Sequence, residues 1–230
     1  MNSTFCGEVL TSIRGLKFPD LYVTKFFFKE KLHLKESKGK VLELGCGNGN
    51  NLILFRAYGY ETIGIDVDKK AIEDANYNFK LLFGKEGYHF VESNFLKFPI
   101  IKEFLKEPLD VLLIPNSLNY VRREDFFSLL KFLKDTLKGK LKIFLRFRSP
   151  RDSRVCCGEP LGKGEFLIKT DITGEKGQIL TVYEENEMVF LLREFLNLSN
   201  YKVFHLYEEN LHSGIKVLNA DIVLWGDIEL

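Results

Sequence analysis

The sequence predicts an α/β fold in which helices cover both faces of a mostly parallel sheet. Short apolar segments that end at glycine or at an acid alternate with segments whose apolar residues recur at helical spacing. Strands separated by helices pair in parallel through right-handed crossovers, which bury the sheet between two helical layers. The 230 residues, 45% hydrophobic and 28% charged, suffice for one packed core. We therefore expect a single domain over residues 1–230.

The alternation of strands and helices starts after residue 39. Residues 1–39 are expected to form an N-terminal helical cap, with an amphipathic helix over 22–34. Five strands are expected, at 41–44, 61–66, 88–92, 109–114 and 141–147. Helices are expected around 52–56, over 69–83 and over 123–138, and the two longer ones carry apolar residues along one face.

The regular alternation of strands and helices ends after Pro150. Residues 165–170 and 178–183 flank the turn-forming stretch TGEKG, which predicts a hairpin inserted after the fifth strand. We expect the segment 151–184 to form a hairpin arm or lid. A helix at 187–198 and strands near 201–207 and 220–225 close the chain, giving seven strands in the main sheet, of which the final strand is antiparallel.

The charge balance argues against two classes of partner. With 33 Lys and Arg against 32 Asp and Glu, the formal net charge is +1, so the chain as a whole does not attract nucleic acid or an anionic membrane. Residues 1–40 differ, because eight cations against four acids leave 8 − 4 = +4, a local footprint that a nucleic acid could use. No apolar run reaches the roughly 18 residues of a membrane-spanning helix, and the first residues lack a secretory pattern. We expect a cytoplasmic protein.

The four cysteines do not predict a metal site. They form no pair of C-x-x-C motifs and have no histidine partners at zinc spacing. No bound metal is expected.

The glycines after the first strand predict a nucleotide-type site. Gly45, Gly47 and Gly49 stand where the first strand gives way to a helix, a place where backbone amides can approach a ligand closely. A dinucleotide would need G-x-G-x-x-G or a final alanine, whereas this loop reads G-C-G-N-G followed by Asn50. Glu43, just inside the strand, suits a cationic ligand better than a pyrophosphate.

With Glu43, these glycines resemble a known motif. Glu43-x-Gly45-x-Gly47-x-Gly49 is similar to motif I of class I S-adenosylmethionine-dependent methyltransferases, and the matching segments cover about residues 40 to 147. The resemblance implies a Rossmann-like fold and S-adenosylmethionine as cofactor, with S-adenosylhomocysteine as product. It also implies that Asp66, which ends the strand in GIDVD, accepts hydrogen bonds from the ribose hydroxyls.

The third strand and its loop extend the resemblance. Asn94 in FVESNF stands where this family often has an aspartate that contacts the adenine amino group, and an amide oxygen can still accept that bond. Phe95 would lie against the adenine. The full set of cofactor residues that the resemblance implies is Glu43, Gly45, Cys46, Gly47, Asn48, Gly49, Asn51, Asp66, Val67, Asn94, Phe95 and Pro115.

The methyl acceptor leaves a weaker signal. Asn116, Ser117 and Tyr120 follow the fourth strand, in the loop that faces the methyl group in the proteins this sequence resembles. We expect Asn116 and Tyr120 to be the catalytic candidates. Ser117, Arg148 and Tyr22 are the substrate-binding candidates, because a guanidinium can grip a carboxylate or phosphate and the N-terminal helix can cover the site.

Four functions stay open at this point. The loop IPNSLNY lacks the D/N-P-P-Y/F tetrad of many methyltransferases that act on amides and exocyclic amines. The first interpretation is therefore methyl transfer to oxygen or nitrogen of a small molecule, and an RNA or protein methyltransferase is the second. A nicotinamide-dependent oxidoreductase and a cofactor-binding protein without catalysis are the alternatives from other classes.

Overall fold

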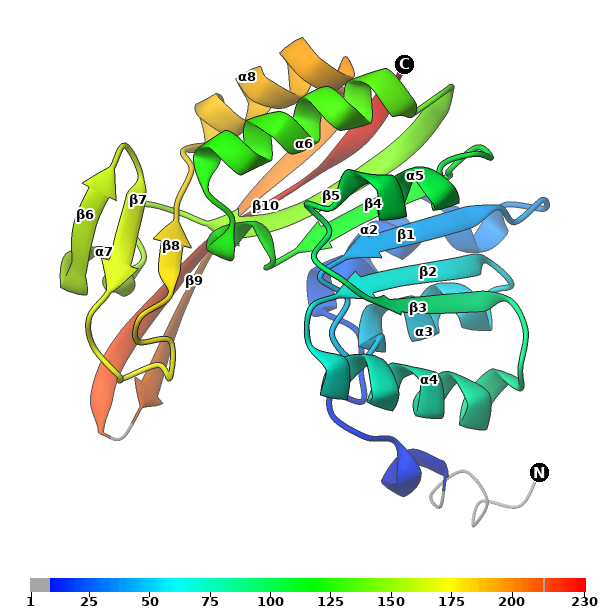
Figure 1. The fold of residues 1–230 in the computed structure, drawn as a ribbon, viewed down its shortest axis with the longest axis horizontal. Helices are drawn as coiled ribbons and strands as arrows, with labels where there is room; N and C mark the ends of the chain where they lie inside the picture. Colours follow the sequence, from blue (N-terminus) through cyan, green and yellow to red (C-terminus); the bar gives the residue numbers. More distant parts are fainter. Residues whose placement is uncertain (1–8, 213) are drawn as a thin grey trace. The chain divides into compact units, whose positions relative to one another are not determined.

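The protein folds into two compact units. The computed structural model describes residues 9–212 and 214–230, and the units divide between Leu113 and Ile114. The main sheet has seven strands in the order β3-β2-β1-β4-β5-β10-β9, and a separate three-stranded sheet has the order β6-β7-β8 (Figure 1). The expected α/β fold with a seven-stranded, Rossmann-like sheet is confirmed.

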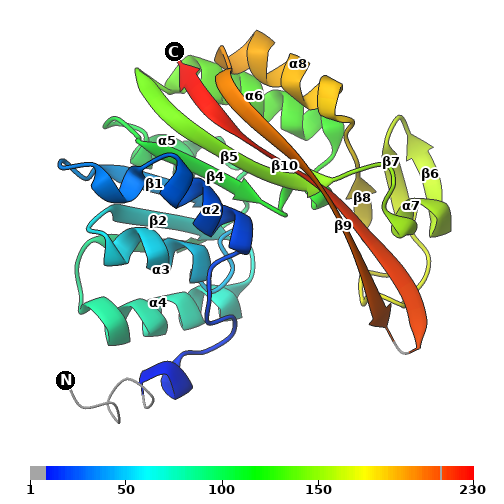
Figure 2. The same cartoon turned by 180° about the vertical axis from the view of Figure 1, so that it is seen from behind.

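The first unit holds the strands that carry the glycine loop. β1 pairs in parallel with β2 and with β4, and β2 pairs in parallel with β3. Figures 1 and 2 show α2 and α3 on one face of these strands and α5 on the other. The elements are α2 (Leu21–Lys29), η1 (Leu32–Leu34), β1 (Lys40–Leu44), α3 (Asn50–Ala57), β2 (Glu61–Asp66), α4 (Lys69–Phe83), β3 (Tyr88–Glu92), α5 (Phe98–Phe104) and β4 (Val111–Pro115), whose last two residues belong to the second unit.

Local sequence explains where the helices of this unit begin. The Asp20 carboxylate accepts from the backbone N–H of Tyr22 and Val23 at the start of α2. Asp68 caps α4 in the same way, and both caps satisfy amides that the helix itself leaves unpaired. The expected apolar face of α4 is buried, with Ala75 and Phe79 fully covered.

The second unit is built on long antiparallel strands. β10 runs antiparallel to β5 and to β9, and the β9–β10 hairpin extends beyond β5 (Figure 2). Its elements are η2 (Leu118–Tyr120), α6 (Arg123–Thr136), β5 (Lys140–Arg148), α7 (Ser153–Cys157), β6 (Gly158–Gly162), β7 (Glu165–Ile168), β8 (Ile179–Thr181), α8 (Glu185–Leu196), β9 (Ser199–His212) and β10 (Ile215–Glu229).

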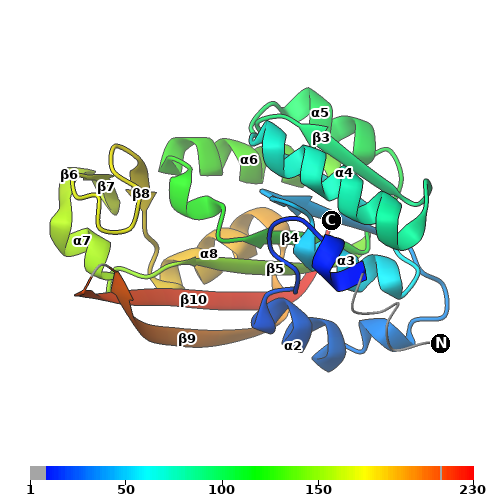
Figure 3. The same cartoon turned by 90° about the horizontal axis from the view of Figure 1, so that it is seen from below.

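The insertion after β5 contains the expected hairpin and more. β7 and β8 pair antiparallel around the TGEKG stretch, which confirms the hairpin. β6 adds a third strand, which the sequence did not predict because Pro160 and its flanking glycines disfavour strand structure. As an edge strand, β6 needs hydrogen bonds on one side only. The short helix α7 precedes this sheet and packs against β10 (Figure 3).

The structure differs from the expected elements most clearly in β9, β10 and α5. β9 and β10 are 14 and 15 residues long, at least twice the expected lengths. The outer end of β9, EENLH, is mostly polar and hides the strand pattern, whereas the outer end of β10, IKVLN, is mostly apolar. The helix α5 was not predicted, since its seven residues are too short to show a period. None of the helices within the described residues is long and apolar enough to cross a membrane.

Candidate cofactor site and acceptor-side residues

The loop between β1 and α3 depends on glycine. Gly45, Gly47 and Gly49 have φ of +78°, +52° and +78°, a backbone region that disfavours other residues. A Cβ on Gly49 would lie 2.9 Å from the Phe79 ring and 3.0 Å from the Phe90 ring, so space also requires glycine there. Around Gly47, by contrast, no atom lies within 4 Å of such a Cβ. The backbone of the loop is therefore open at Gly47 and tightly packed at Gly49.

Asp66 joins the glycine loop to the start of α4. Its Oδ2 accepts from the backbone N–H of Gly47 at 2.7 Å, and its Oδ1 accepts from the N–H of Asp68 at 2.9 Å. Because each carboxylate oxygen has two lone pairs, Asp66 keeps acceptor capacity for a ligand hydroxyl. The neighbouring Val67 is 64% exposed and so is available to a ligand.

Glu43 is a buried carboxyl group of which one oxygen is hydrogen-bonded and the other is not, among the described residues. Its Oε1 accepts from Asn51 Nδ2 at 2.7 Å, and Asn51 Oδ1 accepts from the N–H of Asp20 at 2.8 Å. Its Oε2 has no hydrogen-bond partner among the residues that the structure describes. Burial raises the pKa of Glu43 to about 8, the bond from Asn51 opposes the rise, and Asp66 and Asp20 add to it. The pKa of the adjacent buried Cys46 thiol is also raised, chiefly by burial.

Asparagines of the loop hold the N-terminal segment in place. Asn48 Nδ2 donates to the carbonyls of Arg14 and Leu16 at 2.7 and 2.8 Å. Asn50 Nδ2 donates to the carbonyl of Phe18 at 2.9 Å. The side chain of Asn48, expected at the cofactor, is therefore engaged with the chain itself, as that of Asn51 is, and their cofactor contacts stay predictions. The sequence did not lead us to expect that residues 14–20 are bonded to the glycine loop. The polar run NGNN, which supplies the asparagine donors, was the pattern that could have indicated it.

The two residues expected near adenine sit after β3. Asn94 is exposed, and its Oδ1 accepts from the N–H of Leu96 at 2.8 Å. Phe95 is 8% exposed and contributes to the core of the unit. The Asn94 oxygen thus shapes the turn after β3, and its bond to adenine stays a prediction.

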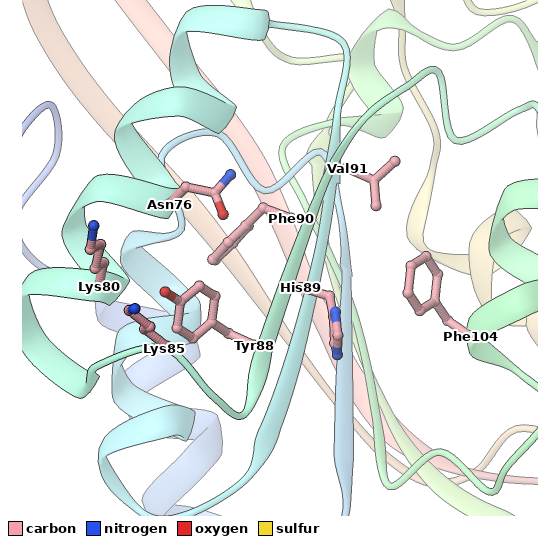
Figure 4. Close-up of a pocket in the computed structure, with 8 residues that line it drawn as sticks. All are labelled: Asn76, Lys80, Lys85, Tyr88, His89, Phe90, Val91 and Phe104. Carbon is pink, nitrogen blue, oxygen red and sulfur yellow. The ribbon is translucent and has the colours of Figure 1, made fainter.

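A separate pocket of about 500 Å³ lies at the outer edge of β3 (Figure 4). On one side of the strand it exposes Lys80 and Lys85, and neither forms an ion pair with any described residue. On the other side, His89 lies with its ring centroid 6.2 Å from that of Phe104. The lining consists of Asn76, Lys80, Lys85, Tyr88, His89, Phe90, Val91 and Phe104.

In the second unit, an unusual backbone conformation follows β4. β4 ends at the buried Pro115, and Asn116 adopts a φ of +59°, which is uncommon for a residue other than glycine. Its N–H donates to the carbonyl of Arg146 at 2.8 Å, and its carbonyl accepts from Asn119 Nδ2 at 3.1 Å. Asn119 is 1% exposed, and its Oδ1 accepts from the N–H of Arg148 at 2.8 Å. Asn119, which the sequence did not single out, thus fixes the loop that carries Asn116 and Ser117.

The remaining acceptor-side candidates are already bonded within the protein. Tyr120 donates its hydroxyl proton to Glu175 at 2.7 Å, and burial, reinforced by this bond, raises its pKa to about 12. Arg148 Nη1 lies 2.6 Å from Asp221 Oδ1 and 3.6 Å from Asp152 Oδ2, so its charge is compensated. In the first unit, Tyr22 packs under the Lys25 ammonium, 4.4 Å from the ring centroid. Their contacts with an acceptor stay predictions.

The candidate set contains no metal centre. Within residues 9–212 and 214–230, no group of three or more His, Cys, Asp or Glu side chains is arranged to hold an ion. Cys156 and Cys157 are free and exposed, and Cys46 is free and buried. Cys6 lies outside the described residues.

Comparison with known proteins identifies the domain. Residues 35–138 match the model of a family described as a methyltransferase domain. An S-adenosylmethionine-dependent methyltransferase from Methanosarcina mazei has the same fold, with a TM-score of 0.64 at 21% identity over 86% of this chain and 97% of that one. Magnesium protoporphyrin IX methyltransferase from Synechocystis, solved with bound S-adenosylmethionine, has a TM-score of 0.56 at 13% identity over 100% and 93%.

Sequence similarity also reaches a longer protein. A putative ribosomal RNA large subunit methyltransferase of Methanocaldococcus jannaschii is 28% identical over 134 residues, which are 55% of this chain and 32% of that relative. The chain thus spans about a third of this relative's length.

Residues 35–138 therefore match a methyltransferase domain. The fold is the one found in S-adenosylmethionine-dependent methyltransferases, and S-adenosylmethionine is the cofactor of those proteins.

The residues of the first unit fit this cofactor. S-adenosylmethionine carries a sulfonium and an ammonium group, and a buried carboxyl group with an unpartnered oxygen at Glu43, beside two further acids, complements a cation. Asp66 retains lone pairs for the ribose diol. The open backbone at Gly47 allows close approach of the ligand. When bound, the cofactor supplies the electrophilic methyl group.

Proposed function

We propose that this protein transfers the methyl group to an oxygen or nitrogen atom of a small-molecule acceptor. The observation that carries the proposal is that most of the basic residues near the N-terminus, the part of the chain with excess positive charge, are bonded within the protein. Arg14 pairs with Asp74, and Lys35 pairs with Asp110. Lys38 Nζ donates to two carbonyls at 3.1 Å. A polyanionic acceptor would need such cations to be free.

The second unit offers groups that suit a compact acceptor. Asn116 and Tyr120 are the candidates to orient the reacting atom, and Ser117 and Arg148 are the candidates to bind the rest of the molecule. Tyr22, in the first unit, is a further binding candidate. Methyl transfer is an in-line displacement, so orientation of the acceptor can supply much of the rate acceleration. Tyr120, whose pKa is about 12 and whose proton is held by Glu175, is suited to orient the acceptor rather than to act as a base at neutral pH.

An RNA acceptor is the second candidate. Two observations favour it: the name of the curated relative, and the pocket at β3, where Lys80 and Lys85 lie near aromatic rings. Lysines bind phosphate, and bases stack on aromatic side chains. In this interpretation the pocket at β3 would hold a single-stranded part of the RNA.

A direct assay separates the two candidates. Formation of S-adenosylhomocysteine from S-adenosylmethionine is measured with a fractionated pool of small metabolites and, separately, with total RNA. We expect turnover with a metabolite fraction that is insensitive to salt and to the double substitution Lys80→Ala and Lys85→Ala. Turnover with RNA only, falling steeply with salt and with this substitution, would establish the second candidate instead.

A further inference from the structure

A chain of hydrogen bonds connects Tyr120 to the interior of the second unit. The Tyr120 hydroxyl donates to Glu175 Oε1 at 2.7 Å, although the two residues are 55 positions apart. Glu175, in the connection between β7 and β8, also accepts from Arg154 Nε through Oε2 at 2.5 Å. The acceptor-side loop and the inserted sheet are therefore joined through one carboxylate.

The Arg154 guanidinium that holds Glu175 is itself fixed. Its Nη1 lies 2.9 Å from both oxygens of Asp152, which is fully buried. Its Nη2 donates to Asn219 Oδ1 at 3.0 Å. Asp152 is anchored in turn, because its Oδ2 accepts from the N–H of Ala220 on β10 at 3.1 Å. Glu175 therefore receives its bond from a guanidinium with little freedom to move.

This arrangement determines what the Tyr120 oxygen can do. A phenol has one proton and two lone pairs, and here the proton is given to Glu175. Only lone pairs are left to face any other group. A hydroxyl that donates to a carboxylate also becomes a stronger acceptor, because hydrogen bonds in a chain polarise one another.

We propose that Glu175 is a positioning residue that sets the Tyr120 hydroxyl as the hydrogen-bond acceptor for the N–H or O–H of the atom to be methylated. The substrate class that follows is an amine, amide or hydroxyl compound that still carries its proton when it binds. A thioether or a tertiary amine has no such proton and is excluded. This inference rests on the proposed function, because it assigns Tyr120 to the acceptor side.

The first test measures the link between the two side chains without an acceptor. Glu175→Gln keeps the shape but removes the charge, so we expect the pKa of Tyr120 to fall below about 12, while burial, the larger cause, keeps it above the ordinary value near 10. Phenolate absorbance during a pH titration reports the change, and Tyr120→Phe identifies the signal. Glu159→Gln is the matched control, because Glu159 lies on β6 of the inserted sheet and, among the described residues, forms an ion pair only with the exposed Lys169. An unaltered titration in Glu175→Gln would overturn the proposal.

The second test measures turnover. In the metabolite fraction that supports S-adenosylhomocysteine formation, Glu175→Gln and Tyr120→Phe should each lower turnover roughly 10- to 100-fold, the range for losing one hydrogen bond to a charged group. The double variant should be no slower than the slower single variant, since both act through one bond. Calorimetry with S-adenosylhomocysteine should give an unchanged Kd.

The remaining outcomes of these tests decide between a positioning and a structural role of Glu175. Additive losses in the double variant, or a cofactor affinity that falls as much as turnover does, would assign Glu175 a purely structural role. Turnover of a thioether or tertiary amine would contradict the substrate class. If no fraction supports turnover while the titration changes as expected, the proposed function fails but the link between Glu175 and Tyr120 stands.

Discussion

Glu43 should couple cofactor binding to pH. Its pKa of about 8 in the cofactor-free chain means that the carboxyl group is mostly protonated at neutral pH. A cationic ligand binds the ionised form better, so binding must be accompanied by loss of that proton. The affinity for S-adenosylmethionine is therefore expected to rise with pH.

The size of the effect follows from the ionised fraction. With a pKa of about 8, about one molecule in a hundred is ionised at pH 6 and about one in ten at pH 7. Because the apparent Kd is the intrinsic Kd divided by the competent fraction, it should fall roughly ninefold from pH 6 to 7, roughly fivefold from pH 7 to 8, and level off above. At pH 7, about 0.9 proton should leave for each cofactor bound.

Calorimetry in buffers with different ionisation enthalpies counts these protons directly. Glu43→Gln keeps the amide contact with Asn51 but cannot ionise, so its Kd should not change over this pH range. Glu92→Gln, at the exposed end of β3, is the matched control and should behave like the wild type. A wild-type Kd that is constant from pH 6 to 8, or an unchanged slope in Glu43→Gln, would refute the reasoning.

The raised pKa of Glu43 also predicts how the stability of the folded chain depends on pH. An acid whose pKa is raised from 4.5 in the unfolded chain to about 8 in the folded chain favours the folded state fully below pH 4.5. That contribution is lost as pH rises from 4.5 through 8. Without cofactor, the wild type should therefore lose stability over this range relative to Glu43→Gln, as measured by urea unfolding.

Three further substitutions and one control test the site and its supports. Asp66→Ala should weaken S-adenosylhomocysteine binding by about 1.5 to 3 kcal/mol in calorimetry, whereas Asp68→Ala should cost only the helix cap, about 0.5 to 2 kcal/mol of stability, and leave binding unchanged. Asn51→Leu should lower the free energy of unfolding by about 1 to 3 kcal/mol, because it removes the only partner of the buried Glu43 among the described residues; no change would contradict that role. Asp152→Ala should lower it by about 3 to 5 kcal/mol, because it removes the buried carboxylate that Arg148 and Arg154 share and leaves each of them one acidic partner among the described residues, Asp221 or Glu175; a smaller loss in urea unfolding would show that water reaches the arginines.

Much of the fold could be predicted because its strands are short, apolar and bounded by turn residues. β2 and β3 were expected with the ends that the structure shows, and β1 differs by one residue at its start. The outer end of β9, EENLH, could not be predicted because it carries no apolar alternation, and the outer end of β10, IKVLN, is too short a pattern to show that the strand continues without its partner β9. Pairing between those two strands, not their own sequence, defines their length.

The cofactor site was more predictable than the acceptor side for a related reason. The cofactor signal is carried by a loop of five residues and by Asp66, and its geometry is largely a matter of glycine backbone at Gly45, Gly47 and Gly49. The Tyr120 to Glu175 bond joins residues 55 positions apart, and the Arg148 to Asp221 pair joins residues 73 positions apart. Such pairs have no local spacing to recognise, so Glu175, Asp152 and Asp221 could not be found from the sequence.

The charges of the two units show why a nearly neutral chain can still bind a cation selectively. In the first unit, Glu43 is buried with one oxygen unpartnered among the described residues, so negative charge becomes available only when a cation arrives. In the second unit, Arg146, Arg148 and Arg154 are each paired with a buried aspartate, Asp152 or Asp221, so their positive charge is already compensated. The net charge of +1 averages these opposite situations and conceals both. An acceptor that must still lose a proton therefore meets fixed hydrogen-bonding groups rather than a free cation, which favours recognition by geometry over recognition by charge.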